Sequence, residues 1–358
     1  MDNNMVTAIP NEYFHAVHKE LQGTLAEVTY PVKQYINKAR QLVTNQEITQ
    51  TMAGRETVRG EAILKKCNIY LPAGYDQEDG NRRYNVLYLL HGVGGNRYEW
   101  PCGSGNIDGN HVICNLLDHM ISKGDIEPLI VVFPDGRSAC DWTDTSFNAE
   151  GTNMLGFYYF DYELRYDLIP YIESQYHTWS DIRDKSQDKI EFNRRHRAVA
   201  GLSMGGMQAL NLVLGGYRYD SVQYTKSSSR WKNGLDMTVP VPGMLDLFAY
   251  VGAFSNAPTT SAGEILGAGL ASGQYKLDVL YLTCGDADGV AYHAGYKTAV
   301  EDLAETAGDM LGELYEVIIK DGAHDFPVWN NGAYNFLRII SGHPLEQTGG
   351  SIRSRITI

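Results

Sequence analysis

The chain has 358 residues, of which 43% are hydrophobic, and it carries a formal net charge of −13 at pH 7. This apolar fraction supplies a full hydrophobic core and excludes a globally disordered chain, and the length suits one large α/β domain with insertions. The acidic balance argues against nucleic acid and anionic membrane surfaces as partners.

The N-terminal part of the chain is predicted to contribute four strands and one helix. Residues 1–24 are expected to form a loose or helical lead-in. The strands are expected at Ala26–Tyr30, Ala62–Leu71, Tyr84–Leu90 and Leu129–Phe133. The third is almost entirely apolar, which is typical of a central strand buried on both faces. Helical spacing of apolar residues over Asn110–Lys123 predicts a helix before the fourth strand.

The C-terminal part repeats the alternation of strands and helices. Further strands are expected at Ala198–Ala200, Phe248–Phe254, Val279–Cys284 and Leu314–Ile319. Helices are expected at Tyr158–Tyr176, Met207–Leu214, Ala291–Ala307 and Pro327–Ile340. Pro170 should kink the first of these helices or mark a junction in it. Residues 217–243 are interpreted as an insertion over the rim of the sheet and residues 342–358 as a tail, within a single domain spanning residues 1–358.

Strands that alternate with helices predict an α/β fold, with a mostly parallel sheet of about eight strands flanked by helices. Ligand sites in such sheets lie beyond the carboxyl ends of the strands. The chemically notable stretches of this chain follow predicted strands: His91–Gly95, Ser203, Gly285–Asp288 and Gly322–Phe326. We therefore expect these stretches to share one edge of the sheet.

The segment Gly201-Leu202-Ser203-Met204-Gly205 has the G-x-S-x-G pattern, with a predicted strand before it and a predicted helix after it. This context is that of the nucleophile elbow of α/β-hydrolases, where a tight turn exposes the serine hydroxyl. The glycines permit the turn, and the N–H of Met204 lies at the helix start, where an anion is favoured. The alternative is a glycine-rich turn with an incidental serine.

A serine nucleophile needs an adjacent base, and the best candidate is His324, which follows the last strand. Asp286 and Asp288 both follow an earlier strand, and either could orient the base. The order serine, aspartate, histidine is that of α/β-hydrolases. The alternatives are a solvated loop histidine and turn-forming aspartates.

The glycine-rich loop His91–Gly95 is expected to supply the second oxyanion N–H, because glycines let the backbone approach a substrate oxygen. A phosphate-binding loop is the alternative, but the chain has no G-x-x-x-x-G-K-[ST] motif there. His91 is interpreted as a structural loop residue, since no second histidine lies at metal-ligand spacing. No metal or cofactor is expected.

The five cysteines have no metal-site spacing. Cys67 and Cys284 are expected to be buried thiols, whereas a bond between Cys102 and Cys140 is left open. No signal peptide is visible and no apolar run approaches ~20 residues, so the chain is expected to be soluble, secreted if a signal was removed and otherwise cytoplasmic. Oligomeric state is left open.

Four stretches of the chain together resemble the feruloyl esterases of carbohydrate esterase family 1, in the esterase D-like group of α/β-hydrolases. They are residues 84–95 followed by Trp100, residues 196–206, residues 248–258 and residues 324–329. The resemblance implies a serine carboxylesterase that releases hydroxycinnamic acids from plant cell-wall arabinoxylan through an acyl-enzyme.

By this resemblance, Ser203 is the nucleophile, His324 the base and Asp288 the acid. Val93 and Met204 would supply the oxyanion N–H groups. Residues 31–60 and 217–243 are longer than in the compact family pattern, which affects the expected substrate more than the expected reaction. Three tryptophans are candidates to line the substrate pocket, with ordinary packing as the alternative for each: Trp100, Trp142 and Trp329.

Other hydrolases of the same fold remain as alternatives, because one triad serves many esters. They are acetyl-xylan esterases, other small-ester hydrolases including S-formylglutathione hydrolases, siderophore-ester hydrolases and acyltransferases. Leu202 argues against the S-formylglutathione hydrolases, whose elbow usually has histidine at this position. A non-catalytic carbohydrate-binding protein is disfavoured, since all three triad residues are present.

Overall fold

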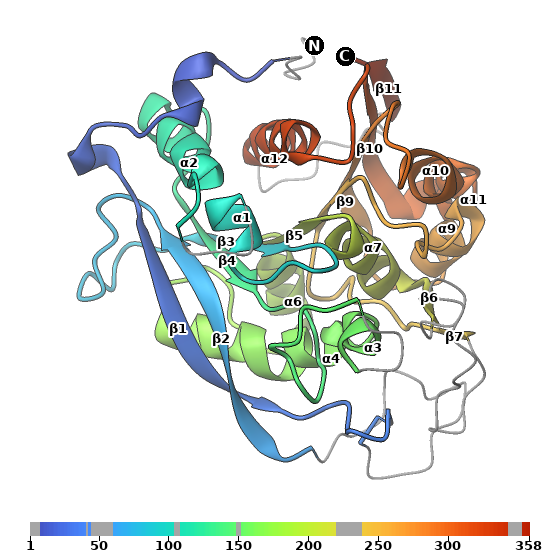
Figure 1. Cartoon of the computed structure of the whole chain (residues 1–358). Coiled ribbons are helices and arrows are strands. Elements are labelled where there is room, and N and C mark those ends of the chain that lie inside the picture. The colour runs from blue at the N-terminus through green and yellow to red at the C-terminus, as the bar shows by residue number, and fades with distance from the viewer. Residues whose placement is uncertain are drawn as a thin grey trace.

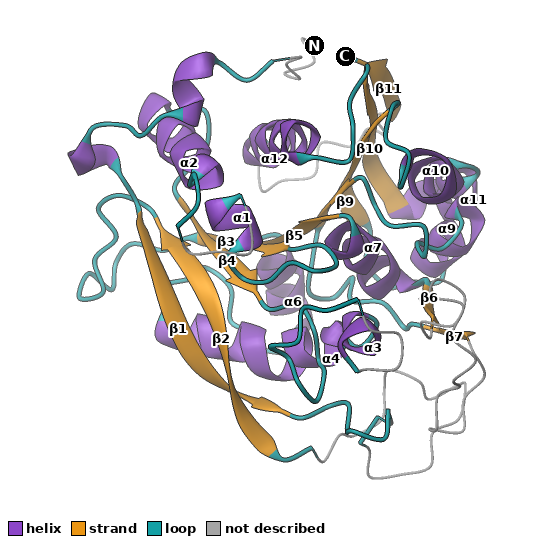
Figure 2. Cartoon of the chain, in the orientation of Figure 1, coloured by secondary structure: helices purple, strands orange, loops and turns teal. Residues whose placement is uncertain are grey.

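The computed structural model describes residues 8–40, 42–43, 60–103, 108–147, 152–219, 238–342 and 353–358. Within these residues, nine strands form one mixed sheet flanked by helices (Figure 1 and Figure 2). The strands are β1 (Thr24–Lys33), β2 (Ala62–Leu71), β3 (Asn85–Leu90), β4 (Leu129–Pro134), β5 (Arg197–Leu202), β8 (Tyr250–Phe254), β9 (Leu277–Gly285), β10 (Leu311–Ile319) and β11 (Arg353–Thr357).

The sheet has the strand order β1-β2-β4-β3-β5-β8-β9-β10-β11. The pairs β1–β2 and β2–β4 are antiparallel, and the strands from β4 to β11 are parallel to their neighbours. The chain therefore has the predicted α/β-hydrolase fold with a mostly parallel sheet. All eight predicted strands are present, and β11 is an additional one that the sequence analysis treated as tail.

Helices cover both faces of the sheet. They are α1 (Glu99–Cys102), α2 (Val112–Lys123), α3 (Asn153–Phe157), α4 (Phe160–Glu163), α5 (Ile169–Gln175), α6 (Gln187–Arg194), α7 (Met204–Leu210), α9 (Gly263–Ala271), α10 (Thr298–Val300), α11 (Leu303–Ala307) and α12 (Phe326–Ser341). Short 3₁₀ turns lie at Asn11–Phe14, Lys19–Leu21 and Gly308–Met310, and π-helical turns at Leu164–Leu168, Asn211–Gly215 and Tyr292–Lys297.

The side chains of β3 alternate between two hydrophobic clusters, as the twofold period of a strand requires. Val86 and Tyr88 belong to the cluster that includes side chains of α5 and α7. Leu87 and Leu89 belong to the cluster that includes side chains of α2 and α12. The central strand is thus buried on both faces, as its apolar sequence predicted.

Two predicted helices are interrupted in the structure. The expected helix Tyr158–Tyr176 divides into α4, a π-helical turn and α5, with Pro170 in the first turn of α5, so the predicted junction is confirmed. The prediction of one helix over Ala291–Ala307 is wrong, because the backbone breaks at Asp302, which has φ +58°. The break lets α9 approach so closely that a Cβ at Gly263 would lie 2.0 Å from the carbonyl oxygen of Glu301.

The proposed insertion at residues 217–243 lies largely outside the described residues. Its ends form a separate antiparallel pair, β6 (Tyr217–Tyr219) and β7 (Thr238–Pro240). Residues 31–60 are the other segment that is longer than in the family pattern, and residues 44–59 of it also lie outside the described part. The organisation of the chain as a single domain stays a prediction.

All five cysteines are free thiols, so Cys102 and Cys140 form no disulfide, and Cys67 and Cys284 are buried as expected. Among the helices that the structure describes, none combines the length and the apolar character needed to cross a bilayer.

A buried ion pair connects α5 to the central sheet. The guanidinium of Arg197 lies 2.5 and 3.0 Å from the two carboxylate oxygens of Glu173. The same oxygens accept hydrogen bonds from the Ser180 hydroxyl and the Ile182 amide. Every lone pair of this carboxylate is thus directed at a donor, which offsets the cost of burying it.

Replacing Glu173 with alanine should leave the buried Arg197 cation uncompensated and lower the free energy of unfolding by about 3–5 kcal/mol. Urea denaturation of the wild type and the variant measures this loss. Arg183→Ala is the matched control, because Arg183 pairs with Asp181 at the surface and such pairs contribute at most about 1 kcal/mol. Equal losses in the two variants would contradict this assignment.

Candidate active site

Ser203 lies in the sharp turn between β5 and α7, with φ +51° and ψ −115°. A positive φ is strained for a residue with a side chain, and the surrounding contacts impose it. A Cβ at Gly201 would lie 2.4 Å from the carbonyl carbon of Gly205, and one at Gly205 would lie 2.5 Å from the carbonyl oxygen of Leu90. Only glycines fit at both positions, so the elbow that the sequence predicts is present.

His324 lies in the loop between β10 and α12, beside this serine. Its Nε2 is 3.1 Å from Ser203 Oγ, and its Nδ1 is 2.7 Å from Asp288 Oδ2. Because a carboxylate only accepts hydrogen bonds, Nδ1 carries the proton and Nε2 is left to accept the serine proton. The three side chains form one continuous hydrogen-bonded chain.

The carboxylate of Asp288 is buried in the turn after β9. Its Oδ1 accepts hydrogen bonds from the amides of Val290 (2.9 Å) and Ala291 (2.8 Å). Burial by itself raises the pKa of this carboxyl, but the hydrogen bonds from His324 and Ala291 outweigh it and lower the pKa to about 2. Asp288 is therefore ionised at neutral pH.

Asp286, the other candidate for the acid of the triad, is directed at the backbone of Asp321. It is exposed, and its Oδ1 accepts a hydrogen bond from the backbone amide of Asp321 at 2.6 Å. The structure thus brings Asp288 to His324 and leaves Asp286 as a residue that joins two loops.

The glycine loop after β3 lies against the serine. A Cβ at Gly92 would be only 3.2 Å from the Cβ of Ser203, so the amide of the next residue, Val93, lies in the neighbourhood of the serine hydroxyl. Met204 is the first residue of α7, where amide N–H groups have no partner within the helix. The Gly92–Val93 stretch and the start of α7 thus lie beside the serine, and the oxyanion role of the Val93 and Met204 amides stays a prediction.

Side chains that the sequence analysis did not single out hold this loop. Glu99 Oε2 accepts a hydrogen bond from the amide of Gly92 at 2.7 Å. The guanidinium of Arg137 donates to the carbonyl of Gly95. Burial raises the pKa of Glu99 above its ordinary value, against the opposing effects of Gly92 and Arg137. The sequence signal for Glu99 was its place directly before Trp100, which the family motif includes.

His91 connects the loop to the turn after β4. Its Nδ1 lies 2.7 Å from the carbonyl oxygen of Gly92, and its Nε2 accepts a hydrogen bond from the amide of Gly136 at 2.9 Å. Burial lowers the pKa of His91 well below its ordinary value, and the nearby Arg137 adds to this effect. The ring is therefore neutral, in agreement with the structural role predicted for it.

The three tryptophans proposed to line a substrate pocket have different environments. The expectation for Trp100 is corrected, because it is 2% exposed and its indole N–H donates to the carbonyl of Leu90 at 2.8 Å in the core. Trp329 packs edge-on against the His324 ring, with 5.2 Å between centroids. Trp142 is half-buried in the loop after β4, with the Lys65 ammonium 5.9 Å from its ring centre. For Trp329 and Trp142 a substrate contact stays a prediction.

Comparisons with known proteins agree with this geometry. The family model "Putative esterase" matches residues 65–234. Endo-1,4-beta-xylanase Y of Acetivibrio thermocellus is 30% identical over 277 residues, 75% of this chain and 21% of the relative. The endo-1,4-beta-xylanase/feruloyl esterase of Xylanibacter ruminicola is 33% identical over 153 residues, 42% of this chain and 18% of the relative. The chain spans about a fifth of the length of these two relatives.

Solved structures show the same fold. The CE1 ferulic acid esterase of Anaeromyces mucronatus, in complex with ferulic acid, superposes with a TM-score of 0.61 at 20% identity, over 94% of this chain and 97% of that one. The feruloyl esterase module of Clostridium thermocellum, complexed with sinapinate, gives a TM-score of 0.58 at 23% identity, over 96% and 95% of the two chains. The predicted resemblance to feruloyl esterases of carbohydrate esterase family 1 is confirmed.

The lowered pKa of Asp288 makes part of the stability depend on pH. A carboxyl whose pKa falls from 3.8 in the unfolded chain to about 2 in the folded one stabilises the fold above pH 4. This contribution, on the order of 2 kcal/mol, should be lost as the pH falls from about 4 to 2.

Urea denaturation of the wild type and Asp288→Asn across this range measures the effect. The difference between their free energies of unfolding should shift by that amount, because the asparagine does not titrate. A difference that stays constant from pH 5 to pH 2 would contradict the proposed linkage.

Proposed function

We propose that this chain is a serine esterase that hydrolyses hydroxycinnamoyl esters, feruloyl esters above all, of plant cell-wall polysaccharide through an acyl-enzyme. The observation that carries the proposal is the hydrogen-bonded chain from Ser203 through His324 to Asp288, built on a nucleophile elbow. A strained, buried turn that presents a hydroxyl to an imidazole ring has no evident use in packing.

The substrate class is supported by the proteins that the chain resembles. The structures that share its fold include ferulic acid esterases with ferulic acid and sinapinate bound. One sequence relative is named a xylanase/feruloyl esterase, and the other a xylanase. A hydroxycinnamoyl ester carried on xylan would be consistent with both the esterase and the xylanase names of these proteins.

The mechanism follows from the geometry of the triad. As the Ser203 hydroxyl attacks the ester carbonyl, His324 Nε2 accepts its proton across the 3.1 Å contact. The imidazolium that forms is stabilised by the carboxylate of Asp288, which also fixes the tautomer. His324 then protonates the leaving alcohol, and the sugar departs.

Deacylation repeats these steps with water in place of the alcohol. The tetrahedral oxyanion that forms in each half-reaction would accept hydrogen bonds from the amides of Val93 and Met204. Both are backbone donors; the position of the Val93 amide depends on the loop contacts of Glu99, Arg137 and His91, and that of the Met204 amide on the start of α7. Rigid donors aimed at the oxyanion cost no reorganisation during the reaction.

Ser203→Ala should lower kcat by about 10⁴–10⁶-fold, because the nucleophile is removed. The measurement compares hydrolysis of methyl ferulate, p-nitrophenyl acetate and S-formylglutathione by the wild type and the variant. Cleavage of methyl ferulate that disappears in the variant supports both the triad and the substrate class. Cleavage of the acetate alone would replace feruloyl esters by small acyl esters, and near-normal activity of the variant would overturn the assignment of Ser203.

A second comparison tests the choice of acid. Asp288→Asn should lower kcat by about 10⁴-fold, since the amide disfavours the tautomer that lets His324 act as a base. Asp286→Asn is the matched control, two residues away in the same turn, and should change kcat by no more than about twofold. The reverse ranking would assign the acid to Asp286.

A further inference from the structure

Residues 254–257, at the end of β8 and directly after it, hold the backbone of Ser203 from both sides. The amide of Ser203 donates to the carbonyl of Phe254 at 2.9 Å, and its carbonyl accepts a hydrogen bond from the amide of Ala257 at 3.0 Å. Both backbone groups of the proposed nucleophile are thus bonded to one short segment. The position of the elbow therefore depends on the path of this segment.

Ser255 connects this segment to β9, the strand that leads to Asp288. The amide of Ser255 donates to the carbonyl of Thr283 in β9 at 2.7 Å. Its φ is +47°, which costs free energy for a residue with a side chain, whereas glycine adopts such a conformation freely. The side chain of Ser255 is also fully buried. Because glycine would satisfy the backbone better, the hydroxyl needs an explanation of its own.

The hydroxyl of Ser255 faces the carboxylate of Asp288 and the thiol of Cys284. The pairing of Phe254 with Thr283 places the next residues of the two strands, Ser255 and Cys284, beside each other. Against the effect of burial, Ser255 adds to the hydrogen bonds that lower the pKa of Asp288. Ser255 Oγ makes no close hydrogen bond to any described residue. It is therefore a buried donor that lies beside a buried carboxylate.

Asp288 has one position left for such a donor. An ionised carboxylate accepts about four hydrogen bonds, shared between its two oxygens. Oδ1 accepts from the amides of Val290 and Ala291, and Oδ2 accepts from His324 Nδ1. Among the described residues, the thiol of Cys284 also approaches Oδ2, at 3.6 Å, but a thiol is a weak donor. A hydroxyl is a stronger donor, and leaving it unpaired in the interior is costly.

We propose that Ser255 is a positioning residue of the catalytic site, whose hydroxyl donates to the remaining position on Asp288 Oδ2. The inference rests on the triad of the proposed function and adds to it a residue that does not touch the substrate. With Oδ2 held by Ser255 and by His324, the carboxylate resists rotation away from the imidazole. Because the same segment holds the backbone of Ser203, it fixes the acid and the nucleophile relative to each other.

Kinetics of p-nitrophenyl acetate hydrolysis test the role of the hydroxyl. Ser255→Ala should lower kcat about tenfold and change KM by less than about twofold, because the hydroxyl acts on Asp288 and not on the substrate. Ser261→Ala is the matched control, since Ser261 is equally buried but accepts a hydrogen bond from the amide of Tyr217, and it should keep the wild-type kcat. A wild-type kcat in Ser255→Ala, or a change confined to KM, would overturn the proposal.

Ser255→Gly separates the hydroxyl from the backbone conformation. Glycine adopts a positive φ without strain, so this variant keeps the turn and still lacks the donor. Its kcat should fall as far as that of Ser255→Ala. A wild-type kcat in the glycine variant would show that the position serves the turn alone, and the proposal would be wrong.

Proton NMR of the His324 Nδ1–H gives a second readout that needs no substrate. The resonance is assigned by its loss in His324→Ala. It should move upfield in Ser255→Ala, because the carboxylate turns and its hydrogen bond to the imidazole lengthens, and it should stay in place in Ser261→Ala. An unchanged resonance in Ser255→Ala would contradict the proposal. Since this measurement involves no ester, a failure of the wild type to hydrolyse esters would affect only the proposed function.

Discussion

The close approach of β3, β5 and α7 at the carboxyl edge of the sheet is the constraint on which the candidate active site depends. Gly201 and Gly205 leave no space for a side chain between the elbow and the end of β3. The neighbouring strand β8 completes the restraint, because the amide of Ser203 donates to the carbonyl of Phe254 at 2.9 Å. The strained serine conformation is therefore sustained by strands that are distant in sequence, and neither β5 nor α7 alone would hold it.

At the same edge of the sheet, the Asp288 carboxylate and the rings of His324 and His91 have different functions. Asp288 is kept ionised by three donors, and His324 between it and Ser203 is held in the tautomer of a base. His91 is kept neutral by burial and acts as a rigid link between two loops. The buried His91 and the partly exposed His324 thus have opposite uses, because their hydrogen-bond partners differ.

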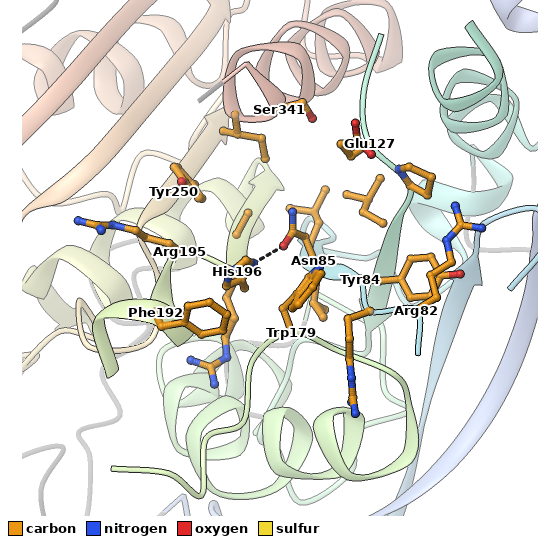
Figure 3. A pocket seen from close by; sticks show the side chains of 18 residues that line it. Arg82, Tyr84, Asn85, Glu127, Trp179, Phe192, Arg195, His196, Tyr250 and Ser341 are labelled. Atoms are coloured by element: carbon orange, nitrogen blue, oxygen red, sulfur yellow. Dashed lines mark hydrogen bonds between the residues drawn. The ribbon is translucent and has the colours of Figure 1, made fainter. Parts of the chain in front are cut away.

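The two ends of the parallel strands offer different chemistry. At the carboxyl ends, loops and the start of α7 bring backbone donors together, which suits an oxyanion. At the amino ends, the described residues place the rings of Trp179, His196 and Phe192 against one another beside a cavity (Figure 3).

The sequence by itself determined the alternation of strands and helices, the elbow around Ser203 and the position of His324 directly after the strand that is β10 in the structure. These follow from local periodicity and from residues that a tight turn requires. It left Asp286 and Asp288 equivalent on their residue types, because two carboxylates in one turn differ only in the direction that the folded backbone gives them. That choice rested on the family resemblance until the tertiary structure placed Asp288 against His324.

Tertiary packing alone decided that Trp100 is a core residue, that the helix after β9 breaks at Asp302, and that α6 and α9 form. The residues of α6 are mostly polar and show little apolar periodicity, and those of α9 include three glycines, which weaken its intrinsic helical tendency. The cavity around His196 joins residues from β3, β5, α6 and the loop before α6. No local pattern signals such a cavity, because its parts meet only when the strands align.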